Sequence, residues 1–388
     1  MDICYITAEY PPQIGGVGDY VRYLSGEVAA RGHGVTVVTS AGRGVKASRG
    51  EGRPRQVLPV INKWNLRHLP ALIRALRTVG ADVYVLEFVV FMYGRGGVAP
   101  WLVAFFDAFR RRVGRPLILN VHEIYRPRRS GVKGTVLSWM SRKCYEAAVW
   151  GCASAVVTNS YRERLLRELP GVDSKRVTRI PVGTNIPAAR IRSRASRDRE
   201  ELYITSFGLW NQDRAIEELV HAVSAVTSPR PLRLFLVGGY GNEERRVERI
   251  RRLAAELGLE GRVEITGPLS AGAVSGYLAR SDIFVSPEAA GPSGRRGSLI
   301  AAYAHGLPVV AYDGREREDV FRDGDNIIVV PEGDASSLAT AVERLAGNDA
   351  LRRTMGERAR ATFDEYFAWP RIAEQWDREV FVRVAEAL

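Results

Sequence analysis

The residue types best suited to chemistry gather between residues 285 and 311. Arg295 and Arg296 stand there just before Ser298, whose side-chain oxygen could cap the start of a helix. A helix N-terminus offers free backbone N–H groups, and two guanidinium groups add charge-assisted donors, so together they favour a multiply charged anion. We therefore predict a phosphate or diphosphate site. The alternative is that two solvated arginines precede an ordinary buried helix.

A glycine-rich loop forms the second candidate site. It follows a predicted strand at residues 2–7 and contains Gly15 and Gly16, ahead of a helix predicted from about residue 20. Paired glycines let a backbone approach a phosphate or a sugar closely. A dinucleotide fingerprint would need a third glycine where Val21 stands, which argues against a dehydrogenase. A tight turn without a ligand is the alternative.

His122 is the third candidate. It follows a predicted strand at residues 116–121, and the carboxyl end of a strand is where open α/β sheets bind ligands. A single histidine can equally be structural, so a ligand contact and a packing role both stay open at this point.

A basic stretch with aromatic neighbours follows His122. It contains Arg126, Arg128, Arg129 and Lys133. Cations interleaved with aromatic side chains suit a lipid headgroup interface, and they suit a solvated basic surface nearly as well. We therefore expect these residues to contact a partner or a membrane surface.

Length and composition indicate two domains. A chain of 388 residues exceeds the size of a single hydrophobic core, and 46% hydrophobic residues can fill two cores. Three cysteines and five scattered histidines lack the spacing of a metal site or of a disulfide framework, which favours a reducing compartment. The sequence shows no signal peptide and no apolar run of about 20 residues. We expect a cytoplasmic protein, either soluble or peripheral on the inner face of the cell membrane.

Charge is divided unevenly along the chain. Residues 1–190 carry 29 Lys and Arg against 13 Asp and Glu, whereas residues 191–388 carry 27 against 31. The net charge of +16 in the first part points to an anionic partner, either a membrane surface or nucleic acid. Nucleic acid is the lesser candidate because no nucleic-acid-binding motif accompanies the charge.

Strands and helices are predicted to alternate in both parts of the chain. This alternation is typical of doubly wound α/β domains with parallel sheets. It begins anew near residue 202, after a polar and arginine-rich segment at residues 185–201. Because such segments mark domain boundaries, we predict two α/β domains joined there.

Several short motifs, taken in order, resemble those of the retaining family 4 glycosyltransferases of the GT-B fold. They are PPQIGGVG from Pro11, a strand followed by His122-Glu123, IPVGTNIP from Ile180, SFG from Ser206, LVGG from Leu236 and AAYAHGLPVV from Ala301. Each motif is weak alone, but their order and spacing together are fairly specific. The resemblance covers nearly the whole chain.

The resemblance implies an α/β protein of two Rossmann-like, doubly wound domains that face an interdomain cleft. Residues 1–186 would form the acceptor domain, to which a C-terminal helix at residues 370–388 crosses back, and residues 187–369 would form the nucleotide-sugar domain. The implied reaction moves a hexose from a nucleotide diphosphate sugar with retained anomeric configuration, without a metal or another cofactor. The acceptor would be a glycan, a lipid or lipid-linked glycan, or a sugar phosphate.

The resemblance also implies roles for single residues. Gly15 and Gly16 would lie against the donor phosphates and His122 near the transferred sugar, so that His122, Gly16 and Arg214 form the catalytic set. The family motifs add Gly208 and Gly238 to the donor-binding residues. The residue types of this chain, rather than the resemblance, predict further donor contacts from Glu288, Ser293, Arg295, Arg296, Gly297 and Ser298, and acceptor or membrane contacts from Arg126, Arg128, Arg129 and Lys133.

The chain departs from the family pattern at the donor site, which indicates a divergent branch. Leu209 and Arg214 stand where an arginine and a lysine are usual, and Ser293 and Ala301 replace two glutamates. We expect the arginines to hold the diphosphate, and Glu288 or Ser293 to replace the lost carboxylates. The alternative is a catalytically inactive GT-B scaffold that binds a nucleotide sugar or an anionic membrane.

Overall fold

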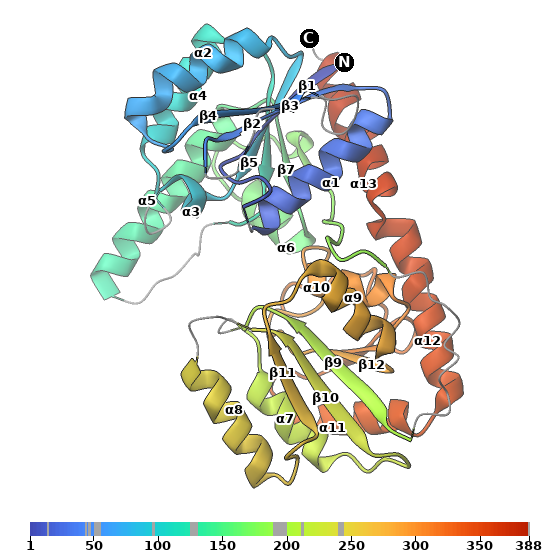
Figure 1. The fold of residues 1–388 in the computed structure, drawn as a ribbon. Coiled ribbons are helices and arrows are strands. Elements are labelled where there is room, and N and C mark those ends of the chain that lie inside the picture. The colour runs from blue at the N-terminus through green and yellow to red at the C-terminus, as the bar shows by residue number, and fades with distance from the viewer. Residues whose placement is uncertain are drawn as a thin grey trace. The chain divides into compact units, whose positions relative to one another are not determined.

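Strands and helices alternate along the whole chain, as the apolar runs predict (Figure 1). The computed structural model describes residues 1–13, 15–42, 45, 48–49, 56–94, 98–124, 131–188, 200–210, 213–239 and 244–386. The chain divides into two compact units, of which unit 1 is Met1–Pro181 with Trp369–Leu388 and unit 2 is Val182–Ala368. The predicted division after residue 186 differs from this one by a few residues.

Unit 1 is built on an eight-stranded sheet in its described residues. The strand order is β3-β4-β2-β1-β5-β6-β7-β8, and every pair is parallel except β3 with β4. The strands are β1 (Asp2–Ile6), β2 (Gly34–Ser40), β3 (Ser48–Arg49), β4 (Gln56–Ile61), β5 (Val83–Phe88), β6 (Leu117–Val121), β7 (Ser154–Val157) and β8 (Val177–Arg179). Strands β5, β6 and β7 are buried along their whole length, which explains why most of their residues are apolar.

The helices of unit 1 bury one apolar face each against this sheet. In α2, Leu69, Leu72, Ile73 and Leu76 recur at helical spacing and are all buried, and Gly80 ends the helix in the left-handed conformation. The described helices between the strands are α1 (Gly16–Ala30), α2 (Leu69–Val79), α3 (Val90–Tyr93), α4 (Trp101–Arg112), α5 (Gly131–Trp150) and α6 (Ser160–Arg167), with short 3₁₀ helices η1 (Leu66–His68) and η2 (Ser174–Arg176).

A C-terminal segment completes unit 1. It comprises α13 (Trp369–Trp376), the π-helical turn η4 (Asp377–Phe381) and α14 (Val382–Glu386). Helix α13 packs on α1, where the Trp376 indole donates a hydrogen bond of 3.1 Å to the Tyr20 hydroxyl. Asp377 forms an ion pair with Arg31 at 3.1 Å. Residues from the end of the chain therefore support the first helix.

Unit 2 contains a six-stranded parallel sheet in the part that the structure describes. The order is β11-β10-β9-β12-β13-β14, with β9 (Leu202–Gly208), β10 (Leu232–Gly238), β11 (Val263–Gly267), β12 (Ile283–Ser286), β13 (Val309–Tyr312) and β14 (Ile328–Val330). The helices are α7 (Ile216–Ala225), α8 (Glu244–Glu256), α9 (Ala271–Arg280), α10 (Gly297–Ala304), α11 (Ala335–Ala346) and α12 (Asp349–Thr362), which continues into the π-helical turn η3 (Phe363–Phe367). Two doubly wound α/β units were predicted, and the structure confirms them.

The predicted cap of α10 is wrong. The helix begins at Gly297, its N-cap residue is Arg296, and no side chain caps it. Ser298 thus lies inside the first turn, where its hydroxyl is available to another group. Strand β4 was not predicted, because Pro59 interrupts its apolar run and proline weakens the pattern of a strand.

Each sheet has a switch point, from which successive strands are added toward opposite edges of the sheet. In unit 1 this point lies between β1 and β5, and in unit 2 it lies between β9 and β12. The loop with Gly15, the end of β5 and His122 after β6 share the carboxyl edge of the first sheet. Ligands of open α/β sheets bind at such edges, so each unit has one natural binding edge.

Candidate functional site

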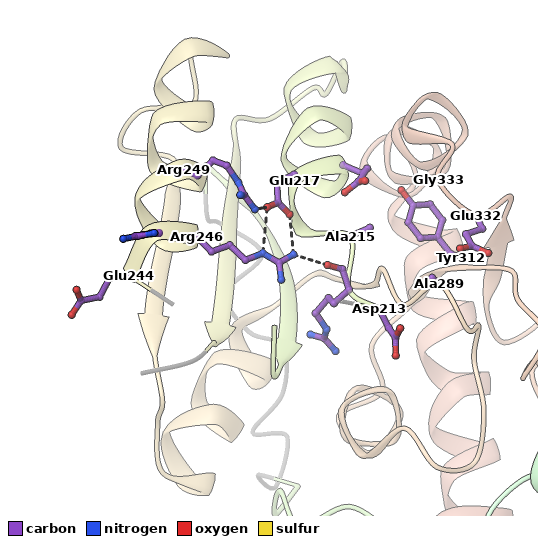
Figure 2. Close-up of a pocket in the computed structure, with 13 residues that line it drawn as sticks. Asp213, Ala215, Glu217, Glu244, Arg246, Arg249, Ala289, Tyr312, Glu332 and Gly333 are labelled. Atoms are coloured by element: carbon purple, nitrogen blue, oxygen red, sulfur yellow. Dashed lines mark hydrogen bonds and ion pairs between the residues drawn. The ribbon is translucent and has the colours of Figure 1, made fainter. Parts of the chain in front are cut away.

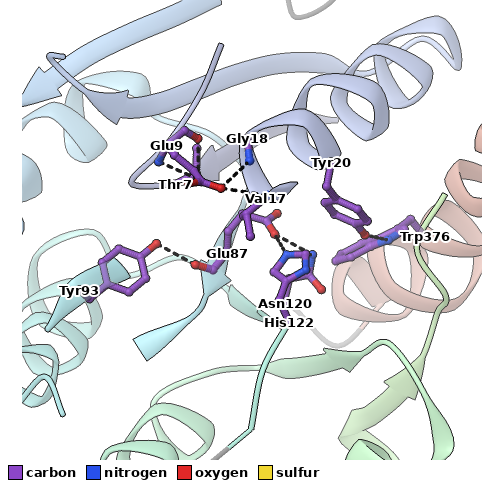
Figure 3. Close-up of polar contacts among 10 residues, drawn as sticks. All are labelled: Thr7, Glu9, Val17, Gly18, Tyr20, Glu87, Tyr93, Asn120, His122 and Trp376. Carbon is purple, nitrogen blue, oxygen red and sulfur yellow. Dashed lines mark hydrogen bonds and ion pairs between the residues drawn. The ribbon is translucent and has the colours of Figure 1, made fainter. Parts of the chain in front are cut away.

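His122 lies in a buried polar cluster at the carboxyl edge of unit 1 (Figure 3). Its Nε2 atom is 2.5 Å from Oε2 of Glu87, and the same oxygen accepts a hydrogen bond of 2.8 Å from the Asn120 amide. Glu87 and Asn120 are partners on neighbouring strands. Burial raises the pKa of Glu87 above its usual value, although the hydrogen bond from His122 opposes the rise. Sequence reasoning missed Glu87, whose signal was a carboxylate inside an otherwise apolar strand.

Aromatic side chains enclose this cluster. The Tyr20 ring meets the His122 ring edge to face with 4.9 Å between centroids, and the Trp376 indole holds the Tyr20 hydroxyl. The Tyr93 hydroxyl donates a hydrogen bond of 2.7 Å to the backbone oxygen of Glu87. Burial raises the pKa of both tyrosines, so their hydroxyls stay neutral. The cluster is therefore held rigidly by packing as well as by hydrogen bonds.

Glu9 occupies the start of α1, beside the predicted phosphate loop. Its Oε1 atom accepts hydrogen bonds from the backbone N–H groups of Val17 at 2.9 Å and of Gly18 at 3.1 Å. A carboxylate from this chain thus takes the position at the helix N-terminus that the sequence had assigned to a ligand. Gly16 differs from Gly15 in its surroundings, because a Cβ atom added to Gly16 would meet nothing within 4 Å. Only Gly16 leaves room for a ligand against the loop.

Arg214 and Glu288 form a buried ion pair in unit 2. The same guanidinium donates a hydrogen bond of 3.3 Å to the Ser298 hydroxyl, and Glu288 accepts a further hydrogen bond from the Ser286 hydroxyl. Burial would raise the pKa of Glu288, but the charges of Arg214 and Arg296 outweigh it and hold the pKa below its usual value. Glu288 thus has protein partners on both carboxylate oxygens, and its predicted role in place of a sugar-binding carboxylate stays a prediction.

Two guanidinium groups at this site have unused donors. The Nε and Nη1 atoms of Arg214 and the Nε and Nη2 atoms of Arg296 are buried without a hydrogen-bond partner among the described residues. The Ser293 hydroxyl, which was predicted to contact the nucleotide sugar, is also buried without a hydrogen-bond partner among the described residues. Glu288 interacts with both arginines, so two guanidinium groups, one buried in Arg214 and one half-buried in Arg296, share this one carboxylate.

Gly208 and Gly238 permit the close packing of this cluster. A Cβ atom on Gly208 would lie 2.7 Å from Nη2 of Arg214, and Gly208 itself has a φ of +140°. A Cβ atom on Gly238 would lie 2.7 Å from the Gly208 backbone oxygen, at a φ of +95°. Gly208 therefore leaves room for the Arg214 guanidinium, and Gly238 leaves room for the backbone of Gly208.

Arg295 has a partner that the sequence did not reveal. Its Nη1 atom lies 3.3 Å from the carboxylate of Glu316, which is almost fully buried. Arg295 is thus paired within the protein, and the expectation that Arg295 and Arg296 bind an anion together stays a prediction. The structure brings Arg296 together with Arg214 instead. Gly297 contributes the first residue of α10 beside them.

A pocket of about 820 Å³ adjoins Arg214 at the starts of α7 and α8 (Figure 2). Arg246 crosses it, pairing with Glu217 at 2.9 Å and donating a hydrogen bond of 2.8 Å to the backbone oxygen of Arg214. Acidic and basic side chains line the pocket in nearly equal number. The pocket itself therefore has little preference for an anion, and its role in the site is to fix the loop that carries Arg214.

The structure describes only part of the basic stretch of unit 1. Arg126, Arg128 and Arg129 lie outside the described residues, and Lys133 lies in α5 with a side chain that is not described. Further along α5, Trp139 is 61% exposed and Val136 is 50% exposed. Across the described ranges, every helix is too short or too polar to span a bilayer.

The family of the chain follows from comparison with known proteins. Residues 15–183 match a family described as glycosyl transferase 4-like domain, and residues 201–348 match glycosyl transferases group 1. The chain belongs to glycosyltransferase family 4. His122 follows β6 in unit 1 and Arg214 follows β9 in unit 2, so each lies beyond the carboxyl end of a strand of its own sheet.

Curated relatives in this glycosyltransferase group share part of the sequence. An exopolysaccharide phosphotransferase of Streptomyces coelicolor is 32% identical over 176 residues, which are 44% of this chain and 18% of that protein. A D-inositol 3-phosphate glycosyltransferase of Acidothermus cellulolyticus is 26% identical over 365 residues, which are 85% of this chain and 78% of that protein. The chain thus matches only about a fifth of the first relative's length.

Solved structures establish the GT-B fold. Sucrose-phosphate synthase from Thermosynechococcus elongatus has a TM-score of 0.78 at 20% identity, with all of both chains covered. The HepE protein of Anabaena, solved in complex with UDP-glucose, has a TM-score of 0.70 at 17% identity and covers 100% of this chain and 99% of that one. The predicted fold class, with a Rossmann-like sheet in each unit, is confirmed.

Proposed function

We propose that the protein is a retaining glycosyltransferase that moves a hexose from a nucleotide diphosphate sugar to an acceptor hydroxyl. Unit 2 would bind the diphosphate, and His122 of unit 1 would contact the transferred sugar. Support comes from the family and from the UDP-glucose complex of HepE. The chain would need no metal or other cofactor, because its own cations are placed to take that role.

The observation that carries this proposal is the positive charge of the buried Arg214 and the half-buried Arg296. Four of their N–H-bearing nitrogens have no partner among the described residues, and buried donors are costly when unpaired. A diphosphate offers several anionic oxygens, which would satisfy these donors and neutralise the excess charge. An uncharged ligand could satisfy the donors but would leave the charge uncompensated.

The same groups suit the chemistry of transfer. When the bond from the sugar to the diphosphate breaks, negative charge develops on the departing phosphate oxygen, and donors already in place stabilise it most effectively. Glu288 and Ser298 hold the Arg214 guanidinium in position before any ligand binds. With retention, the acceptor attacks from the face of the leaving group, and the diphosphate can accept the acceptor proton. Arg214 and Arg296 would thus assist departure, while unit 1 supplies the sugar contact.

The acceptor is proposed to be a glycan, a lipid-linked glycan or a sugar phosphate. The excess of basic residues before residue 190 and the exposed Trp139 and Val136 on α5 favour an acceptor at an anionic membrane surface. The protein would then act at the cytoplasmic face of the membrane, with α5 as its contact.

Calorimetric titration with UDP, GDP and ADP tests the diphosphate site directly. Arg296→Ala should weaken binding of the preferred nucleotide at least tenfold, or about 1.4 kcal/mol, because it removes unpaired donors without stripping a carboxylate of its ion pair. Arg214→Lys should have a similar effect, since lysine keeps the charge beside Glu288 but loses the planar fork.

The matched control is Arg317→Ala, which removes an arginine of unit 2 that pairs with Asp313 at 3.3 Å on the surface. This variant should bind nucleotide like the unaltered protein. If Arg296→Ala and Arg214→Lys also bind within threefold of the unaltered protein, the diphosphate site is elsewhere. The anomeric configuration of the product, read by NMR on a transferred hexose, tests retention separately.

A second candidate function is a GT-B scaffold that binds a nucleotide sugar without transferring it. Ser293 and Ala301 favour it, because they stand where the family has glutamates and both are fully buried. Single-turnover assays over UDP-, GDP- and ADP-sugars distinguish the two functions. Tight binding of a nucleotide sugar with neither transfer nor slow hydrolysis would support the scaffold and contradict the proposed enzymatic function.

A further inference from the structure

The carboxylate of Glu87 is buried with the His122 ring as its ionisable partner. Glu87 is fully buried, its Oε2 atom meets Nε2 of His122 at 2.5 Å and the Asn120 amide at 2.8 Å, and its Oε1 atom has no hydrogen-bond partner among the described residues. Within the same ranges, no Lys or Arg forms an ion pair with Glu87. The imidazole is thus the group that can balance the carboxylate (Figure 3).

The other titratable groups described around Glu87 supply no positive charge, so His122 is the group that can balance the carboxylate. Tyr5 of β1, Tyr20 of α1 and Tyr93 of α3 approach Glu87 from three elements, and burial raises the pKa of each, so they stay neutral. Glu9, in the loop after β1, is hydrogen-bonded to the start of α1 and adds only negative charge. A net negative pair would therefore lie in apolar surroundings without compensation, which is costly.

The number of protons on the Glu87–His122 pair determines whether Nδ1 of the ring can donate a hydrogen bond to a ligand. A neutral pair holds two protons, one between Glu87 and Nε2 and the other on Nδ1, whereas a negative pair leaves Nδ1 bare. The two ring nitrogens diverge, so Nδ1 is directed away from Glu87. It makes no hydrogen bond to the described residues, and His122 remains 10% exposed at its side chain.

We propose that Glu87 is a positioning residue that keeps Nδ1 of His122 protonated, so that the ring donates a hydrogen bond to a sugar hydroxyl at neutral pH. The inference rests on the proposed function for the identity of the ligand. Glu87 itself touches no substrate and acts through the tautomer and charge of the ring. A protonated Nδ1 selects a ligand group that accepts a hydrogen bond, here a hydroxyl oxygen.

Glu87→Gln isolates this role. The glutamine oxygen can still accept the Nε2 proton, so the ring stays in place but is neutral and Nδ1 is left without a proton. Catalytic efficiency of the unaltered protein should then vary by less than about threefold from pH 6 to pH 8. In the variant it should be at least tenfold lower than in the unaltered protein at pH 8, because Nδ1 then carries no proton to donate.

A spectroscopic readout tests the proposal without catalysis. In ¹⁵N-histidine NMR at pH 7, with His122 assigned from the spectrum of His122→Gln, the unaltered protein should show a proton on Nδ1. Glu87→Gln should show a bare Nδ1 and a protonated Nε2. A bare Nδ1 in the unaltered protein, or a Glu87→Gln spectrum identical to it, overturns the inference.

Controls separate this inference from folding and from the proposed function. Glu146→Gln makes the same change at a buried carboxylate on α5, where Lys143 and Arg142 pair with it, and should leave the His122 signals unmoved. If Glu87→Gln does not fold, the spectrum of the unaltered protein alone decides. If no nucleotide sugar is bound or consumed, the proposed function fails while the protonation of His122 is still measured.

Discussion

Arg214 and Arg296, the two arginines of the proposed diphosphate site, differ in how they are held. Arg214 is fixed by a carboxylate and a hydroxyl, whereas Arg296 has buried nitrogens with no partner in the described residues. A single carboxylate between two cations keeps the cluster assembled without cancelling its charge. Removing Glu288 would leave the cations to repel each other, and supplying a second carboxylate would remove the attraction for an anion.

The paired glycines allow a residue-scale prediction. Gly16→Ala should leave thermal stability nearly unchanged, because open space surrounds the added methyl group, yet it should weaken nucleotide-sugar binding about tenfold if a ligand approaches this backbone. Melting temperature and calorimetric affinity measure the two effects. Unchanged affinity in Gly16→Ala would remove the loop from the binding site.

Gly15→Ala supplies the contrast for that measurement. The added Cβ atom would lie 2.3 Å from the Glu9 carboxyl group, which must then leave the backbone N–H groups of Val17 and Gly18. Loss of a helix-capping interaction costs about 1 kcal/mol. The melting temperature should therefore fall in Gly15→Ala and hold in Gly16→Ala.

Helices α7 and α8 are joined by a clamp of one carboxylate and two arginines. Glu217 of α7 pairs with Arg246 at 2.9 Å and with Arg249 at 2.5 Å. Burial would raise the pKa of Glu217, but the hydrogen bonds from the two arginines outweigh it and lower the pKa to about 2. A lowered pKa in the folded state stabilises the fold above the unfolded pKa of about 4.3 and loses that effect as the pH falls.

Glu217→Gln should therefore destabilise unit 2 by about 1 kcal/mol at pH 7, a modest figure because the clamp is partly exposed to solvent. The difference should shrink below pH 4 and vanish near pH 2. Hydrogen exchange of the α7 and α8 amides measures it, with Glu218→Gln as the control from the same helical turn. Equal exchange in both variants at pH 7 would show that the clamp adds nothing to stability.

Local patterns predicted most elements, and long-range pairing accounts for what was missed. The strands predicted at residues 2–7 and 116–121 correspond to β1 and β6 within one residue, because apolar runs bounded by polar loops are local signals. The partners Glu87 of His122, Glu9 of α1 and Glu316 of Arg295 are set by how strands and loops meet in three dimensions. No spacing in the sequence encodes those meetings, so the residue types of the site were predictable while their pairings were not.

The uneven charge of the chain gives a prediction for the whole molecule. Vesicles with anionic lipid should retain the protein at ~50 mM salt and release it as the salt concentration rises, because surface charge is then screened. Trp139→Ala should weaken retention, since an exposed tryptophan anchors well at the lipid interface. Equally weak retention by neutral and anionic vesicles would favour a soluble sugar-phosphate acceptor.

The hydrogen bond between Trp376 and Tyr20 has a consequence for biosynthesis, because it joins residues 356 positions apart in the sequence. A ribosome that adds roughly 5–20 residues per second delivers Trp376 roughly 20–70 seconds after Tyr20. All of unit 2 is synthesised in that interval, while α1 waits without the segment that covers it. The packing of α13 on α1 that completes the first unit can therefore form only after the whole of the second unit has been synthesised.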